Sequence, residues 1–160
     1  MKALDATNWF KDVGNRLKML SGFFHNIDHF KKEVSNLDKS SLYLVMDEPK
    51  GGLSGQSNEN IRDGQKFGFF IFSHVSNNDW EAEDAVYDQA KTAALKILGK
   101  VYHERLNQEG LFRFGNIDGV DYMKVGPEYS KWFGCFCTFT VSDNANDQLV
   151  YDENDWEPLT

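Results

Sequence analysis

Two histidines near the N-terminus have a spacing that metal sites use. His25 and His29 are four positions apart with Asp28 between them, and on a helix two imidazoles at this spacing share a face. A zinc protease motif also needs a glutamate directly after the first histidine, and this chain has Asn26 there. The sequence assigns no third ligand. We therefore expect histidines of a helix surface or core, and no bound metal.

The two cysteines are the next candidates for chemistry. Cys135 and Cys137 are two residues apart in an apolar run, so in a strand they point to the same face, where a disulfide between them would be strained. A nucleophilic pair of either cysteine with His74 needs a cation or a helix N-terminus to lower the thiol pKa. The surrounding sequence supplies neither. We expect reduced, buried and inert thiols in a protein made in the cytoplasm.

Two further stretches fall short of known ligand-binding motifs. Residues 51–55 are rich in glycine but lack the Gly-Lys-Ser/Thr sequence opening into a helix that a phosphate loop requires, and they are expected to be a hairpin tip or flexible arm. The acidic residues at 79–84 lack the alternating ligands and central glycine of a calcium loop, so helix capping accounts for them. An enzyme would have to combine these carboxylates with His74. We expect no cofactor.

Hydrophobic spacing predicts an α+β fold for residues 1–141, in which N-terminal helices and one long helix pack on a mainly antiparallel β-sheet. One or two helices are predicted over residues 6–36, with a break at Gly22. Capping side chains at 77–79 begin a helix of about 28 residues. The predicted strands are residues 42–46, 66–75 (the sheet centre), 111–114, 120–125 and 132–141.

The same spacing identifies the expected core. The apolar face of the long helix runs from Val86 to Leu106. In the last strand, the face with Cys135, Cys137 and Phe139 is expected to point to the core. The side chains expected to be buried are Phe70, Phe72, Val86, Ile97, Leu98, Val101, Phe136 and Phe139.

Charge is distributed unevenly along the chain. The 160 residues include 17 Lys+Arg and 25 Asp+Glu, a net charge of −8, which disfavours a protein that works mainly by neutralising nucleic-acid phosphates or anionic lipids. Residues 142–160 contain six of the acidic residues and no Lys or Arg, which leaves 19 acidic against 17 basic residues in the rest. No secretory signal or membrane-spanning run is recognisable. We expect no membrane association and no sequence-specific nucleic-acid binding.

A polar loop at 50–65 and an acidic tail or docking arm at 142–160 are expected to contact other proteins. Loops of this length are uncommon in compact domains unless they are functional. The tail carries more apolar side chains than a solvated terminus needs, which indicates an arm that docks on a partner; a disordered terminus is the alternative. The candidate interface residues are Leu53, Ile61, Leu149, Val150, Tyr151 and Trp156.

A succession of segments spans most of the predicted domain: FHNIDHF at 24–30, LYLVMDE at 42–48, FGFFIFSHV at 67–75, Asp79, VYD at 86–88 and WFGCFCTFTV at 132–141. It resembles a family of small phage and prophage virion proteins associated with tail completion or tail termination. The resemblance implies a non-enzymatic α+β subunit, made in the host cytoplasm, that joins a homo-oligomeric ring of six copies. Its partners would be the tail tube and neck proteins of the virion.

The leading hypothesis is therefore a structural subunit of a phage-type tail. The alternatives are another assembly component of a virion or mobile element, such as a head–tail connector, baseplate part or chaperone, and a small enzyme or stand-alone ligand-binding module. A preformed pocket with perturbed carboxylates or histidines favours the enzyme. Self-association through the loop and tail favours the structural subunit.

Overall fold

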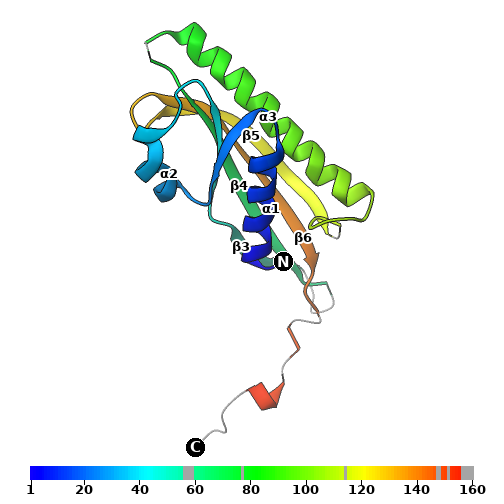
Figure 1. Ribbon diagram of the computed structural model, residues 1–160. Coiled ribbons are helices and arrows are strands. Elements are labelled where there is room, and N and C mark those ends of the chain that lie inside the picture. Colours follow the sequence, from blue (N-terminus) through cyan, green and yellow to red (C-terminus); the bar gives the residue numbers. More distant parts are fainter. Residues whose placement is uncertain (56–59, 77, 114, 147–148, 151, 156–160) are drawn as a thin grey trace, which may run out of the picture.

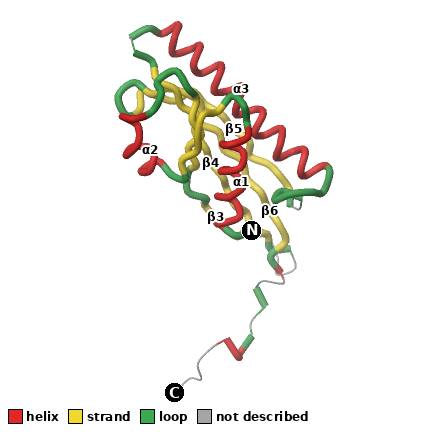
Figure 2. The backbone as a smooth tube through the Cα atoms, viewed as in Figure 1, coloured by secondary structure: helices red, strands yellow, loops and turns green. Residues whose placement is uncertain are grey.

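The computed structural model has the predicted α+β fold and describes residues 1–55, 60–76, 78–113, 115–146, 149–150 and 152–155. Within these residues the α-helices are α1 (Ala3–Arg16), α2 (Ile27–Glu33) and α3 (Trp80–Leu106), with short 3-10 helices η1 (Val34–Asn36) and η3 (Glu153–Asp155). The strands are β1 (Leu20–Phe24), β2 (Leu42–Met46), β3 (Lys50–Ser54), β4 (Arg62–His74), β5 (Asn116–Glu128) and β6 (Trp132–Asn144) (Figures 1 and 2).

β4 lies at the centre of the sheet, as predicted. The strand order is β1-β2-β4-β6-β5, and β3 pairs with β4. β1 and β2 are parallel, whereas the other pairs are antiparallel. β4 pairs with β6 over its whole length, from Arg62 opposite Asn144 to His74 opposite Trp132. This ladder is the frame on which the helices pack.

The helices α1 and α3 cover the same face of the sheet (Figure 1). α3 begins as predicted at Asp79, whose carboxylate accepts hydrogen bonds from the amides of Glu81 (3.0 Å) and Ala82 (3.4 Å). Its predicted core residues Ile97, Leu98 and Val101 are buried, as are Cys135, Cys137 and Phe139 on the facing side of β6. The predicted core face of the last strand is therefore confirmed.

A second, smaller core lies on the opposite face of the sheet beneath α2. Phe30 of α2 is fully buried; its ring stacks on Phe72 at 5.4 Å and meets Trp132 edge to face at 5.3 Å. Trp132 is thus only 2% exposed, although the sequence placed it away from the core. Phe70 and Phe136 stack at 4.3 Å on this face but are half-buried rather than buried, because α2 contacts mainly β1 and β2.

Residues 20–24 form a strand, and the prediction of helix there was wrong. Leu20, Phe23 and Phe24 have helical spacing, but they pair with β2 as a parallel edge strand. Gly22 lies within this strand and does not break a helix. Tertiary pairing here outweighs the local pattern, which is a weak determinant over so few residues.

Two predictions around the end of α3 were also wrong. Residues 111–113 form a turn rather than a strand, because the amides of Leu111 and Phe112 bond to the carboxylate of Glu104. Leu106 is 81% exposed, and Val86 is half-buried, because the fully buried side of α3 begins at Ala90 and its last apolar member is Val101.

The predicted boundaries of the loop and tail change. β3 pairs with residues 62–66, so the described residues of the predicted loop at 50–65 lie mainly in two paired strands. We call these two paired segments the hairpin. β6 continues to Asn144, so the first three residues assigned to the tail belong to the last strand.

Gly134 allows β6 to lie close to β4. A Cβ at this position would overlap the carbonyl oxygen of Ile71, so we expect Gly134→Ala to lower the free energy of unfolding by at least about 3 kcal/mol in urea denaturation. Gly99 is the matched control, because a Cβ added to it on α3 meets no atom within 4 Å. Gly99→Ala should raise the free energy of unfolding by about 1 kcal/mol through helix propensity. A Gly134→Ala protein as stable as the wild type would contradict this packing.

Candidate assembly surface

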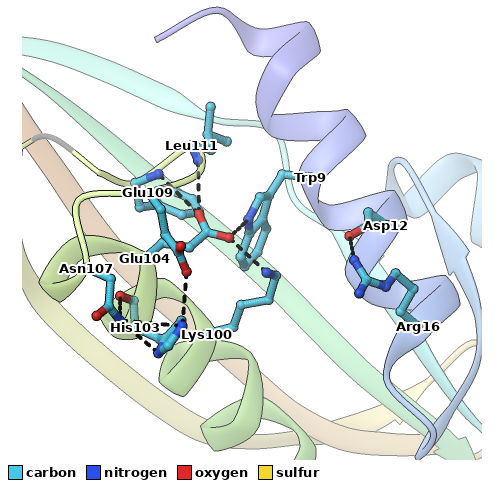
Figure 3. Close-up of polar contacts among 10 residues, drawn as sticks. Trp9, Asp12, Arg16, Lys100, His103, Glu104, Asn107, Glu109 and Leu111 are labelled. Atoms are coloured by element: carbon cyan, nitrogen blue, oxygen red, sulfur yellow. Dashed lines mark hydrogen bonds and ion pairs between the residues drawn. The ribbon is translucent and has the colours of Figure 1, made fainter.

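Glu104 is a buried carboxylate near the C-terminal end of α3 (Figure 3). Its Oε1 accepts a hydrogen bond from the indole Nε1 of Trp9 at 2.8 Å and lies 2.9 Å from the Nζ of Lys100. Its Oε2 accepts hydrogen bonds from the amides of Leu111 (3.0 Å) and Phe112 (3.3 Å). Because donors of the protein occupy both oxygens, this carboxylate joins α1, α3 and the following turn and is not poised as a general base.

The hydrogen bonds to Glu104 lower its pKa. Burial acts in the opposite direction, since desolvation disfavours the charged form, but the bonds from Trp9, Lys100 and Phe112 and the charge of Lys100 together outweigh it. Gly110 leaves room for this arrangement: its φ is +67°, and a Cβ there would overlap the carboxyl group. A carboxylate with a lowered pKa stabilises the fold above its unfolded pKa and loses that contribution as the pH falls.

We expect Glu104→Gln to lower the free energy of unfolding at pH 7 by about 2 kcal/mol, because charge-assisted hydrogen bonds are lost. The difference from wild type should shrink as the pH falls below about 4.3, the ordinary pKa of a glutamate, because the unfolded wild-type chain takes up a proton there while the folded chain keeps Glu104 charged to lower pH. Urea denaturation at several pH values measures both effects. The control is Glu109→Gln, since this carboxylate is 58% exposed and 3.0 Å from His103; its loss should change stability by less than about 0.5 kcal/mol. A difference independent of pH would contradict the ionised role of Glu104.

The histidine pair does not form the helical site considered from the sequence. His25 lies before α2, whose N-cap is Asn26, and the Nδ1 atoms of His25 and His29 are 3.0 Å apart. Within the part of the chain that the structure describes, no group of three or more potential ligands could hold a metal ion. The two rings therefore contact each other at the surface through one shared hydrogen bond.

The cysteines and His74 lie on different faces of the sheet. Cys135 and Cys137 are unpaired and buried under the long helix. Burial raises the pKa of Cys135, and burial together with the neighbouring Cys135 and Asp121 raises the pKa of Cys137 to about 12. The ring of His74 instead meets Trp132 edge to face at 5.6 Å. The fold thus does not assemble a cysteine–histidine nucleophile.

The acidic residues at 79–84 have partners of their own. Asp79 caps α3, and an oxygen of Asp84 lies 2.5 Å from the Nζ of Lys124 on β5. Asp79 and Asp84 thus have structural roles within the domain.

The pKa of His74 is lowered by burial and by the charges of Lys39 and Lys131. Its Nδ1 atom is buried and has no hydrogen-bond partner within the described part of the chain.

The hairpin and the tail, predicted as interface elements, leave the domain at the same end. The amide of Ala145 donates to the carbonyl of Ile61 at 3.0 Å, and the amide of Ile61 donates to Oδ1 of Asn146 at 3.0 Å. Ala145 is buried. We call β3, residues 60–66 and the described residues from 140 to 150 the arm end.

The predicted interface residues have different positions at the arm end. Leu53 on β3 is 60% exposed, Leu149 46% and Val150 72%. Ile61 is half-buried and anchors the tail to the hairpin rather than facing outward. Tyr151 and Trp156 lie outside the described residues.

The N-terminus belongs to the same end, which the sequence did not indicate. Gln65 Nε2 donates to the carbonyl of Met1 at 3.0 Å. A cleft of about 330 Å³ next to this contact is lined in part by the carboxylates of Asp5, Asp63 and Asp143. No local motif marks residues that long-range strand pairing brings together, so only the fold reveals this cleft.

Comparison with known protein families found no match, and no curated protein matches the sequence. Among the described residues, no helix is long and apolar enough to cross a membrane. The function is therefore inferred from the arm end and from the resemblance of the segments between residues 24 and 141.

A substitution of Asn146 tests whether its side chain holds the tail to the hairpin. We expect Asn146→Ala to speed hydrogen exchange at the Ile61 amide by about tenfold, equivalent to 1.4 kcal/mol, because that amide loses its acceptor. Asn154→Ala is the control, since Asn154 bonds only locally, to Asp152, and should leave exchange at Ile61 unchanged. Unchanged exchange in both variants would show that the tail is not held through Asn146.

Proposed function

We propose that this chain is a non-enzymatic structural subunit that assembles with copies of itself into a ring in a phage-type tail. In this proposal it terminates or completes the tail within the neck of the virion and meets the tail tube and neck proteins. The resemblance of the segments at 24–30, 42–48, 67–75, 86–88 and 132–141, together with Asp79, supports the choice of a tail protein. The geometry of the arm end supports the choice of a self-assembling subunit.

The observation that carries the proposal is the joint exit of hairpin and tail from one end of a rigid domain. The β4–β6 ladder continues from the Phe-rich core to Arg62 and Asn144, so the hairpin has a firm base. Residues of both elements are hydrogen-bonded to each other and carry exposed apolar side chains. Contiguous exposed apolar surface marks protein contact sites, and in the proposed closed ring of six copies the exposed apolar side chains of the arm end would be buried between subunits.

The proposal is tested by the solution mass of the full chain, measured by light scattering over a range of concentrations. We expect an oligomer of several subunits that electron microscopy resolves as a ring. Leu53→Glu and Val150→Glu should each raise the midpoint concentration of assembly at least about tenfold, because a charge replaces an apolar contact and 1.4 kcal/mol corresponds to tenfold. Leu106→Glu is the matched control, since Leu106 is exposed at the C-terminal end of α3 and is not among the residues of the arm end.

Two results would overturn the proposal. A wild-type chain that stays monomeric at every concentration and does not bind tail-tube or neck proteins would remove the assembly role. An oligomer that responds to Leu106→Glu but not to the two arm-end substitutions would move the interface elsewhere.

A further inference from the structure

We infer that the acidic tail of one copy binds the groove between α1 and α3 of a second copy. This inference rests on the proposed function and deepens it, because it names the surface that the tail reaches.

The groove combines an apolar floor with a basic rim. It has a volume of about 250 Å³ and lies between the C-terminal half of α1 and the middle of α3. Val13, Leu17 and Ile97 supply the apolar atoms, and the cations on its rim are Arg16, Lys96 and Lys100. Asp12 pairs with Arg16, and the buried Glu104 pairs with Lys100, so three cations and two carboxylates leave the groove one net positive charge.

The rim cations are accessible to a ligand. Arg16 is 74% exposed by side chain, although it lies 3.1 Å from Asp12, and Lys100 is 40% exposed while it contacts Glu104. Lys96 is exposed as well. Residues 1–141 contain 17 basic and 19 acidic residues, so this concentration of positive charge is a local feature of a nearly balanced domain.

The tail has the complementary composition. Between residues 149 and 157 it combines Leu149, Val150, Tyr151 and Trp156 with four carboxylates, and it contains no cation. Acidic residues can pair with the basic rim while the apolar side chains contact the floor. The opposite charges also speed encounter between copies.

The position of the tail favours a second copy as its partner. Figure 1 shows η3 beyond the end of β6, away from α1 and α3 of its own chain. A contact between the tail of one copy and the groove of the next uses two different surfaces, and contacts of this type close into rings when the rotation allows.

Charge reversal on two separate chains tests the inference. The groove variant carries Arg16→Glu and Lys96→Glu; the tail variant carries Asp152→Lys and Asp155→Lys. We expect each variant alone to need at least about tenfold higher concentration to assemble than the wild type, because like charges then meet. An equimolar mixture should regain wild-type assembly, since each tail now meets a groove of opposite charge on the other chain. Lys32→Glu, on the exposed side of α2, is the control and should assemble like the wild type.

The outcomes separate this inference from the proposed function. A wild type that assembles while both reversed variants assemble equally well would overturn the inference and leave the proposed function standing. Two impaired variants whose mixture does not recover would overturn binding between copies. A wild type that never assembles would instead remove the proposed function itself. Circular dichroism and thermal melting confirm that each variant is folded.

Discussion

Glu104 carries a negative charge into the interior, and the surrounding elements supply the donors that this charge requires. The indole of Trp9 on α1 donates a hydrogen bond to this carboxylate, and Lys100, one turn earlier on α3, forms an ion pair with it. The amides of Leu111 and Phe112, in the turn after α3, donate the remaining hydrogen bonds. A buried carboxylate without these partners would cost several kcal/mol. The relative position of α1 and α3 is consequently tied to one side chain. Because Lys100 also lines the groove between these helices, the same interaction shapes the proposed binding surface for the tail.

The sheet connects this core to the arm end through two strands. β4 and β6 contribute aromatic residues to both cores, and the same strands continue to the hairpin and the tail. Burial of Phe67, Phe69 and Phe139 on the helical face fixes the register of the ladder, since a slip by one residue would turn these rings to the other face. The hairpin and the tail are therefore positioned by the packing of aromatic core residues that lie outside the arm end.

The parts of the fold that the sequence predicted well are those with a strong local signal. The aromatic run in β4 and the capped, alanine-containing α3 both appear where the pattern placed them. The failures lie where distant residues decide. β1 is a strand because β2, about twenty residues later, pairs with it. Residues 111–113 are a turn because the Glu104 carboxylate, seven residues before Leu111, accepts hydrogen bonds from the amides of Leu111 and Phe112, a contact that strand spacing does not reveal. The second core was missed because Phe30 and Trp132 are about one hundred residues apart, and no spacing rule links them. Likewise, Leu53 and Val150 are exposed, as expected for a polar loop and a tail, but the hydrogen bond between the Ile61 amide and Asn146 joins residues 85 positions apart and could not be predicted.

The edge strand β5 has features that oppose pairing with a β-strand of another copy of the chain. An edge of 13 residues could accept further strands and grow into a fibre. Its ladder with β6 is interrupted twice, after Asp118 and after Val125, and the second interruption contains Pro127, which has no amide hydrogen to donate. Charged residues such as Asp121 and Lys124 occupy the intervening stretch. Open-ended growth through this edge is thereby opposed.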